Sequence, residues 1–419
     1  MESILHGEYS FLMFIAVILL STKFLGLFTQ RMRMPQVVGA LIAGVLLGPS
    51  CFGLVEKTEF ISCVAELGVI VLMFTAGMET NLQELKKSGL ASFIIALLGV
   101  IVPIGGGFLL SRIWGIGTNS SGGMSSAFMQ QLFIGIILTA TSVSITVETL
   151  KELGKLSTRS GSAILGAAVI DDILGIVALT IIISSSGGDH HEGGSVGMVI
   201  LKIILFFVVS ILASLLFHLI FYKWREHDRK NLHRHTIACF VFCLLLSWMA
   251  EEFFSVADIT GAFVAGLSIS GMKNTAYTAE KFETTSYMLL SPVFFASIGL
   301  TMTNMNMTGS MISFTILLTV IAIVTKIVGC GIGAKLCKYN TKESIQIGVG
   351  MISRGEVALI VANKGKDNGL ISEELFAPII IMVVVTTVVT PILLKLVFRS
   401  KDTADNLSLI HISEPTRLR

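Results

Sequence analysis

The sequence predicts an all-α polytopic membrane protein with about thirteen transmembrane helices. Of its 419 residues, 53% are hydrophobic and 14% are charged, against about a quarter charged in globular proteins. Apolar stretches follow one another, each near the roughly 20 residues that cross a bilayer as a helix. Most Lys and Arg lie in loops after odd-numbered stretches, the densest run being 223–234, so those loops are expected in the cytoplasm.

The expected spans run one after another from near the N-terminus to residue 398. Their approximate limits are 10–28, 36–54, 62–80, 88–113, 130–149, 160–185, 197–222, 236–252, 258–271, 286–303, 311–337, 344–363 and 374–398. The first span leads directly into the second, so it is expected to stay as a membrane helix. The loop charges place the N-terminus outside and the C-terminus in the cytoplasm, as in a protein of the bacterial cell (inner) membrane.

An internal repeat relates the second and ninth spans. Gly39–Gly44 reads GALIAG and Gly261–Gly266 reads GAFVAG, and the same separation joins Gly77 to Gly299. Because the copies are an odd number of spans apart, they run in opposite directions through the membrane. Many secondary transporters are built on such inverted-topology repeats. The alternative is a chance recurrence of small residues in packed helices.

Spans five and twelve are expected to be discontinuous and to cross. Span five contains Thr139–Thr146, a run of hydroxyl side chains that compete with the helix for hydrogen bonds. Span twelve contains Ser353-Arg354-Gly355-Glu356 inside an otherwise apolar run. Broken helices near the midplane expose backbone oxygens to an ion. Arg354 and Glu356 are interpreted either as a structural ion pair or as a modulatory pair of the core.

Two adjacent aspartates, Asp171 and Asp172, lie in the middle of span six. An ionised Asp at a helix centre costs about 2.5 to 3.5 kcal/mol to insert. Lys326 is the only charge in the stretch 312–334 and is therefore the expected partner of Asp171. Successive helix residues point about 100° apart, so Asp172 would face elsewhere. Asp172 would bind either a proton or an alkali cation. Hydroxyl and carbonyl oxygens of span five would complete the coordination shell of the cation.

Two other chemistries are disfavoured. His190 and His191, beside Asp189 and Glu192, lie in a short Gly-rich external loop, where zinc binding is not expected. An intramembrane aspartyl protease needs two carboxylates that converge, whereas neighbours on one helix diverge. We expect no enzyme activity and no cofactor.

The matching motifs resemble those of the monovalent cation:proton antiporter superfamily, near the NapA-like and Kef-like sodium or potassium exchangers. They cover most of the membrane region in family order. They are PQVVGALIAGVLLGP from Pro35, ELGVIVLMFTAGMETNL from Glu66, TATSVSI from Thr139, VIDDILGI from Val169, GAFVAGLSIS from Gly261, SPVFFASIGL from Ser291, the helix of Lys326, GVGMISRGEVALIVA from Gly348 and TTVVTPILL from Thr386.

The resemblance implies a dimer-forming scaffold and a moving core. The scaffold is 10–80 and 236–303, the linker is 197–222, and the core is 88–185 and 311–398. The core is expected to move by an elevator-type motion.

The resemblance also assigns the site. It implies that Asp172 is the main carrier of cation and proton and that Asp171 is the partner of Lys326. Thr141 and Ser142 are implied contributors to the site. The bare aspartate pair is typical of the sodium-type branch.

The expected function is therefore monovalent cation:proton antiport, with Na⁺ favoured over K⁺, and with Li⁺ and K⁺ as further candidate cations. The alternatives are a Kef-like potassium-efflux exchanger regulated by a missing C-terminal domain, and a sodium-coupled symporter. The expected partners are these ions, protons, the lipid bilayer and a second copy of the chain, and no nucleic acid.

The end of the chain is treated separately from the transmembrane exchanger domain 1–398. Residues 399–406 are expected to begin a cytosolic tail. Leu407–Arg417 resembles the translation of a sequencing adaptor, so 407–419 is interpreted as a sequencing scar and set aside.

Overall fold

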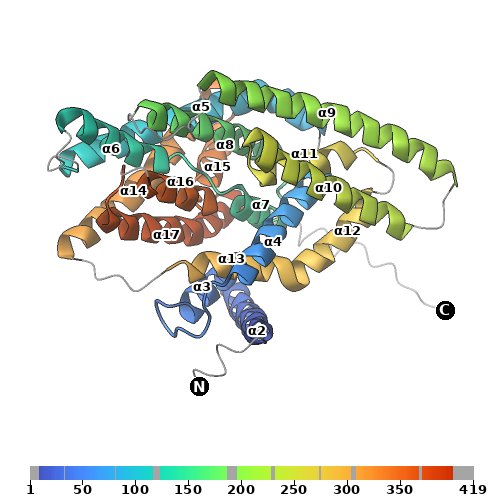
Figure 1. Ribbon diagram of the computed structural model, residues 1–419, viewed down its shortest axis with the longest axis horizontal. Coiled ribbons are helices and arrows are strands. Elements are labelled where there is room, and N and C mark those ends of the chain that lie inside the picture. The colour runs from blue at the N-terminus through green and yellow to red at the C-terminus, as the bar shows by residue number, and fades with distance from the viewer. Residues whose placement is uncertain are drawn as a thin grey trace, which may run out of the picture.

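A computed structural model describes residues 9–32, 34–80, 82–116, 123–185, 196–227, 232–272, 275–302, 308–367 and 370–399. Within these ranges the chain forms helices and no strands (Figure 1). They are α2 (Ser10–Arg31), α3 (Gln36–Leu47), α4 (Glu59–Glu79), α5 (Leu82–Ile113), α6 (Gly123–Ile137), α7 (Val143–Glu152), α8 (Arg159–Ser185), α9 (Val196–His227), α10 (Leu232–Phe254), α11 (Asp258–Ile269), α12 (Thr275–Thr285), the π-turn η1 (Ser286–Leu290), α13 (Ser291–Leu300), α14 (Gly309–Leu336), α15 (Thr341–Gly350), α16 (Glu356–Asp367) and α17 (Glu373–Phe398).

The protein is an all-helical, polytopic membrane protein, as the sequence predicts. Among the described residues, eight helices are long and apolar enough to cross a bilayer: α2, α4, α5, α8, α9, α10, α14 and α17. Helices α3, α6 and α11 are apolar but shorter. Side chains on α9 such as Leu212 and Leu219 are more than half exposed, which suits contact with lipid.

The helices pack in two groups. The first group, α2–α4 with α10–α13, contains the close pairs α4 with α11 and α3 with α13. The second group, α5–α8 with α14–α17, contains α5 packed against both α8 and α14. Helix α9 lies beside α8, α10 and α11 and runs along the top of the view, while α14, α16 and α17 lie at the left of it (Figure 1).

Glycines of the repeated motif permit the close helix pairs of the first group. A Cβ at Gly44 in α3 would overlap the backbone of Ala296 in α13, and one at Gly266 in α11 would overlap the backbone of Phe74 in α4. The two contacts are equivalent, because the same sequence separation joins Gly44 to Gly266 and Phe74 to Ala296. Small residues let helix backbones approach closely in membranes.

Some helices extend beyond the expected spans. Expected span ten, 286–303, is the second part of a longer helical run that begins with α12 at Thr275. The α12 sequence TAYTAEKFETT is polar, so hydropathy does not assign it to a membrane span. Helix α9 also continues to His227, past residue 222, into a charged segment that an apolar pattern does not detect.

Candidate functional site

Two non-helical segments cross in the second group. Residues 138–142 separate α6 from α7, and residues 351–355 separate α15 from α16. The backbone N–H of Ser142 donates to the carbonyl of Ser353 at 2.8 Å, and Ser353 Oγ donates to the Ser142 carbonyl at 2.7 Å. Buried backbone groups need such partners where no water or helix supplies them. The breaks expected in spans five and twelve are therefore present, and they bind each other.

Two threonines complete the crossing. Thr146 Oγ1 donates to the Gly350 carbonyl at 2.8 Å and lies 3.0 Å from Ser353 Oγ. Thr387 of α17 donates to the carbonyl of Arg354. These bonds join α7, α15 and α17 at the two non-helical segments, where the backbone hydrogen bonds of the helices end.

A buried ion pair lies on the helices beside this crossing. Lys326 Nζ of α14 donates to Asp171 Oδ1 at 2.8 Å and to Oδ2 at 3.0 Å. The two side chains are 0% and 1% exposed. The sequence-expected partner of Asp171 is thus in contact with it, and each charge offsets the other's cost of burial.

Gly99 and Cys330 lie beside this pair, and sequence reasoning did not identify either. A Cβ placed on Gly99 of α5 would lie 2.6 Å from Cys330 Sγ and 3.6 Å from Lys326 Nζ. Glycine at this position therefore lets α5 pack directly over the ion pair. The available signal was the position of Cys330 one turn after Lys326, which puts both on one helix face.

Arg354 is the second buried cation of the region and is 0% exposed. Its guanidinium donates to the carbonyl of Met351 at 3.3 Å and to that of Ala322 at 3.2 Å. It also attracts Asp171 electrostatically. Glu356 begins α16, but its side chain lies outside the described residues, so the suggested pair of Arg354 with Glu356 stays a prediction.

Asp172 is 7% exposed and lies on α8 next to Asp171. Gly175, one turn further along, faces the first break, because a Cβ there would lie 4.0 Å from Thr139 Oγ1. Residues three apart share a helix face, so the Asp172 face of α8 looks toward the break. Thr141 and Ser142, in that break, are 1% and 4% exposed.

The oxygens near the first break are mostly engaged locally. Thr141 Oγ1 donates to the Thr139 carbonyl at 3.4 Å, and Ser142 Oγ lies 3.2 Å from Ser144 Oγ. A carboxylate facing hydroxyl and carbonyl oxygens suits a hard monovalent cation or a proton. The roles of these residues stay predictions.

The histidine pair His190 and His191 lies outside the described residues, as does the segment 407–419. Elsewhere, in the part of the chain that the structure describes, no group of three or more His, Cys, Asp or Glu is arranged to hold a metal ion.

Comparison with known proteins identifies relatives over nearly the whole chain. Residues 15–400 match the family model described as sodium/hydrogen exchanger, transmembrane. The chain is 39% identical over 397 residues to the Na⁺/H⁺-K⁺ antiporter GerN of Bacillus cereus, covering 95% of this chain and 98% of that protein. It is 34% identical over 392 residues to a Na⁺/H⁺ antiporter of Enterococcus hirae, covering 92% and 97% of the two chains.

The fold has a solved counterpart. The sodium proton antiporter MjNhaP1 of Methanocaldococcus jannaschii, determined at pH 8, superposes with a TM-score of 0.67. The match covers 96% of this chain and 99% of that one at 16% identity, so it bears on the fold alone.

Proposed function

Because the chain belongs to the sodium/hydrogen exchanger family, we propose that Asp172 carries Na⁺ and protons in turn across the membrane. The chain is a secondary active cation:proton antiporter and not an enzyme. The observation that carries the proposal is the buried contact of Asp171 with Lys326. It neutralises one carboxylate inside the protein, so that the neighbouring carboxylate is the group that exchanges ions.

Exchange follows from the charge of one site. When Asp172 is ionised, a proton or a monovalent cation neutralises it, and the second group can then move past apolar surroundings. An uncompensated charge would make that movement costly. Since only the two loaded forms cross readily, a cation moves one way for each return with protons.

Na⁺ is the proposed cation, and K⁺ is the second candidate. The resemblance supports Na⁺, because a bare aspartate pair is typical of the sodium-type branch. The Enterococcus hirae relative is named for Na⁺ exchange. The name of GerN includes both Na⁺ and K⁺, and that specific observation keeps K⁺ as the alternative.

We also propose that the two helix groups are the scaffold and the moving core of a thirteen-span exchanger. The first group would form the scaffold and the dimer, α9 would be the linker, and the second group would move as an elevator. Two features support this proposal: the equivalent glycine contacts of Gly44 and Gly266, expected of an inverted repeat, and the two crossing breaks inside one group.

The chain is an integral membrane protein with bacterial relatives. The loop charges support an orientation in the bacterial cell membrane with the N-terminus outside and the C-terminus in the cytoplasm. In this orientation Glu79, Lys151 and Glu152 lie at the cytoplasmic ends of their helices.

The test is proton flux in proteoliposomes that contain a pH-sensitive dye, with Na⁺, Li⁺ or K⁺ added in turn. The wild type is expected to respond to Na⁺ and Li⁺, and Asp172→Asn is expected to respond to no cation. Glu66→Gln is the matched control, because Glu66 is an exposed carboxylate of another membrane helix. It is expected to behave as the wild type.

The outcomes separate the candidates. A wild-type response to K⁺ alone would assign the chain to potassium efflux. Cation-driven proton flux retained in Asp172→Asn would remove the exchange role from Asp172, while no response to any cation would favour the symporter.

A further inference from the structure

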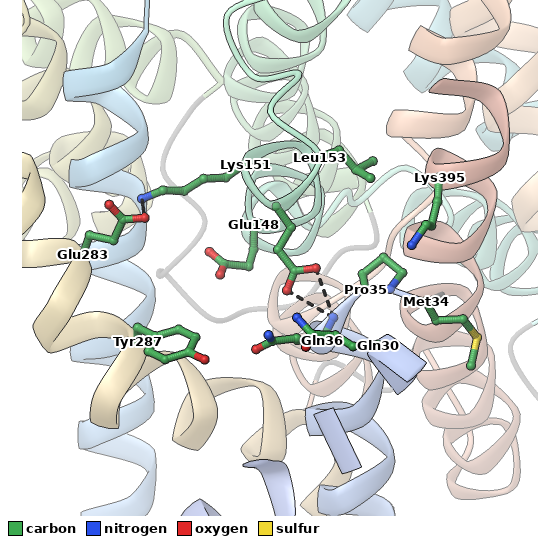
Figure 2. Close-up of a pocket in the computed structure, with 11 residues that line it drawn as sticks. Gln30, Met34, Pro35, Gln36, Glu148, Lys151, Leu153, Glu283, Tyr287 and Lys395 are labelled. Atoms are coloured by element: carbon green, nitrogen blue, oxygen red, sulfur yellow. Dashed lines mark hydrogen bonds and ion pairs between the residues drawn. The ribbon is translucent and has the colours of Figure 1, made fainter. Parts of the chain in front are cut away.

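The end of α7 joins the two helix groups. Lys151 Nζ lies 3.0 Å from Glu79 Oε1 of α4 and 3.5 Å from Glu283 Oε1 of α12. The next residue, Glu152, accepts the backbone N–H of Gln36 at 3.1 Å and 3.0 Å on its two oxygens. Two consecutive residues of the second group therefore bind three helices of the first. Figure 2 shows Lys151 reaching Glu283 of α12.

Glu152 also caps a helix of the other group. Helix α3 begins after Pro35, which makes no side-chain cap. The carboxylate of Glu152 acts as the cap, because it accepts the N–H of Gln36 at the first residue of α3. It therefore lies at the positive end of the α3 dipole. Burial raises the pKa of Glu152, and its hydrogen bonds to the α3 amides lower it by less. The net pKa shift of Glu152 is therefore upward. Burial lowers the pKa of Lys151, but the nearby carboxylates of Glu79 and Glu283 together raise it by more. The net pKa shift of Lys151 is therefore upward.

Among the described residues, apolar packing also joins the two helix groups at the Lys151 end of the second group, and not at its other end. One buried cluster contains Val37 of α3 and Val69 of α4 together with Val147 of α7. A second buried cluster, at the other end of the group, is formed by residues such as Phe133 of α6 and Ala358 of α16. Its described members all belong to the second group and its connecting segments. The groups are therefore packed together at the Lys151 end.

Exposure along α8 agrees with this difference. Residues 160–168, toward the Lys151 end, are all buried. Residues 173–178, beyond the aspartates, are all partly exposed. Helix α8 is thus packed more tightly on the Lys151 side of the aspartates than beyond them.

We propose that Lys151 and Glu152 form an ionic latch that closes the cytoplasmic side of the ion site in this conformation and opens once in every exchange cycle. The proposal rests on the proposed function, because it requires that the two groups move relative to each other. Both are positioning residues, since they act on Asp172 through the position of α7 and α8.

The latch has the properties of a contact that can open. The Lys151, Glu79 and Glu283 side chains are 17%, 31% and 56% exposed, so water reaches these contacts, in contrast to the Lys326 pair. A cavity of about 490 Å³ adjoins the latch and is lined by Glu148, Lys151 and Lys395 among others (Figure 2). Solvent therefore already reaches the groups that would separate.

The first test locks the latch. Gln36→Cys is combined with Glu152→Cys in a background where the exposed Cys51 and Cys63 are replaced by Ser. A short bis-thiosulfonate reagent is expected to cross-link the pair and to reduce Na⁺-driven exchange about tenfold, because an elevator needs both end states. Dithiothreitol is expected to restore exchange.

The matched control joins two residues within the second group. Arg159 and Glu343 lie 3.5 Å apart, and their cysteine pair is expected to cross-link without loss of exchange. Full exchange through a cross-linked Gln36→Cys/Glu152→Cys pair, or failure of that pair to react, would overturn the latch. A background protein without cation-driven exchange would instead overturn the proposed function, and the latch with it.

The second test loosens the latch without a cross-link. Lys151→Met and Glu152→Gln are expected to weaken the apparent affinity for external Na⁺ about threefold and to strengthen that for cytoplasmic Na⁺, because the outward-facing population falls. Lys151→Arg keeps the positive charge and is expected to retain the wild-type apparent affinities for Na⁺ on both sides. A purely structural role would change the amount of active protein, not the ratio of the two affinities. Unchanged affinities on both sides would contradict the proposal.

Discussion

The ion pairs of Lys326 and Lys151 use the same chemistry in different surroundings. The Lys326–Asp171 pair lies inside one helix group and is almost completely buried. The Lys151 pairs lie between the two groups and are partly exposed. The comparison teaches that solvent access, more than distance, distinguishes the two kinds of pair. At 2.8 Å and 3.0 Å the shortest contacts are nearly equal.

The energetic consequence is large. Removing one partner of a buried pair leaves a charge that neither water nor protein compensates, which costs about 3 to 5 kcal/mol. An exposed pair contributes about 0.2 to 1 kcal/mol, because water replaces the lost partner. A buried ion pair is therefore suited to holding a site in place, and a solvent-exposed ion pair is suited to breaking and re-forming.

The largest expected effect is that of Lys326→Met. Because Asp171 would stay buried without its partner, the variant is expected to lose about 3 to 5 kcal/mol of stability. The melting temperature of the detergent-solubilised protein measures the loss, with Lys151→Met as the control. Equal shifts in the two variants would remove the distinction between the pairs. The double variant Lys326→Met/Asp171→Leu is expected to recover much of the stability, since no buried charge remains.

Gly99→Ala tests the packing around the buried pair. The added methyl group would overlap Cys330 Sγ, and overpacking of this kind costs about 1 to 3 kcal/mol. Gly105→Ala on the same helix is the control, because nothing lies within 4 Å of a Cβ there. We expect Cys330→Ala to rescue Gly99→Ala in a thermal-shift assay. A variant with the melting temperature of the control would show that α5 can move away at no cost.

Much of the site was predictable because a membrane makes charge conspicuous. Asp171, Asp172 and Lys326 stand out as the charges of apolar stretches, and a buried lysine needs a carboxylate. Hydroxyl runs and a glycine beside charges likewise marked the two breaks. Gly99 could not be identified in this way, because many glycines occur in the chain and only the packing shows which one meets the pair.

The latch was not predictable for a different reason. Lys151 and Glu152 lie at a helix end, where charged residues are ordinary and solvent makes them inexpensive. Their partners, Glu79, Glu283 and the amide of Gln36, lie far away in the sequence, so only the fold brings them together. The scaffold and core assignment came from the resemblance to a family and stays a prediction, because it depends on motion.

Ser353→Ala tests the crossing, where neutral hydrogen bonds replace ion pairs. The variant loses the bond from Ser353 Oγ to the Ser142 carbonyl and the contact with Thr146, while the backbone bond from Ser142 remains. The expected cost is about 1 to 3 kcal/mol, since a buried carbonyl loses its donor. Ser313→Ala is the control, because its hydroxyl is exposed and bonds within its own helix. Equal melting temperatures of the two variants would show that the carbonyl finds another partner.

The smallest effect is expected for Lys151→Met, and its pH dependence separates the two pairs further. The variant should lose about 0.2 to 1 kcal/mol. The pKa of Lys151 is raised above 10.5 in the folded protein. A raised lysine pKa stabilises the folded state fully below pH 10.5 and loses that contribution as the pH rises through the folded value. Titration of Lys151 itself therefore leaves the stability difference between wild type and Lys151→Met unchanged below pH 10.5, and any change at lower pH comes from the carboxylates that face it, Glu79, Glu283 and Glu148. Melting temperatures of the two proteins between about pH 8 and 11 measure the difference, and a difference lost well below pH 10.5 would contradict the raised pKa of Lys151.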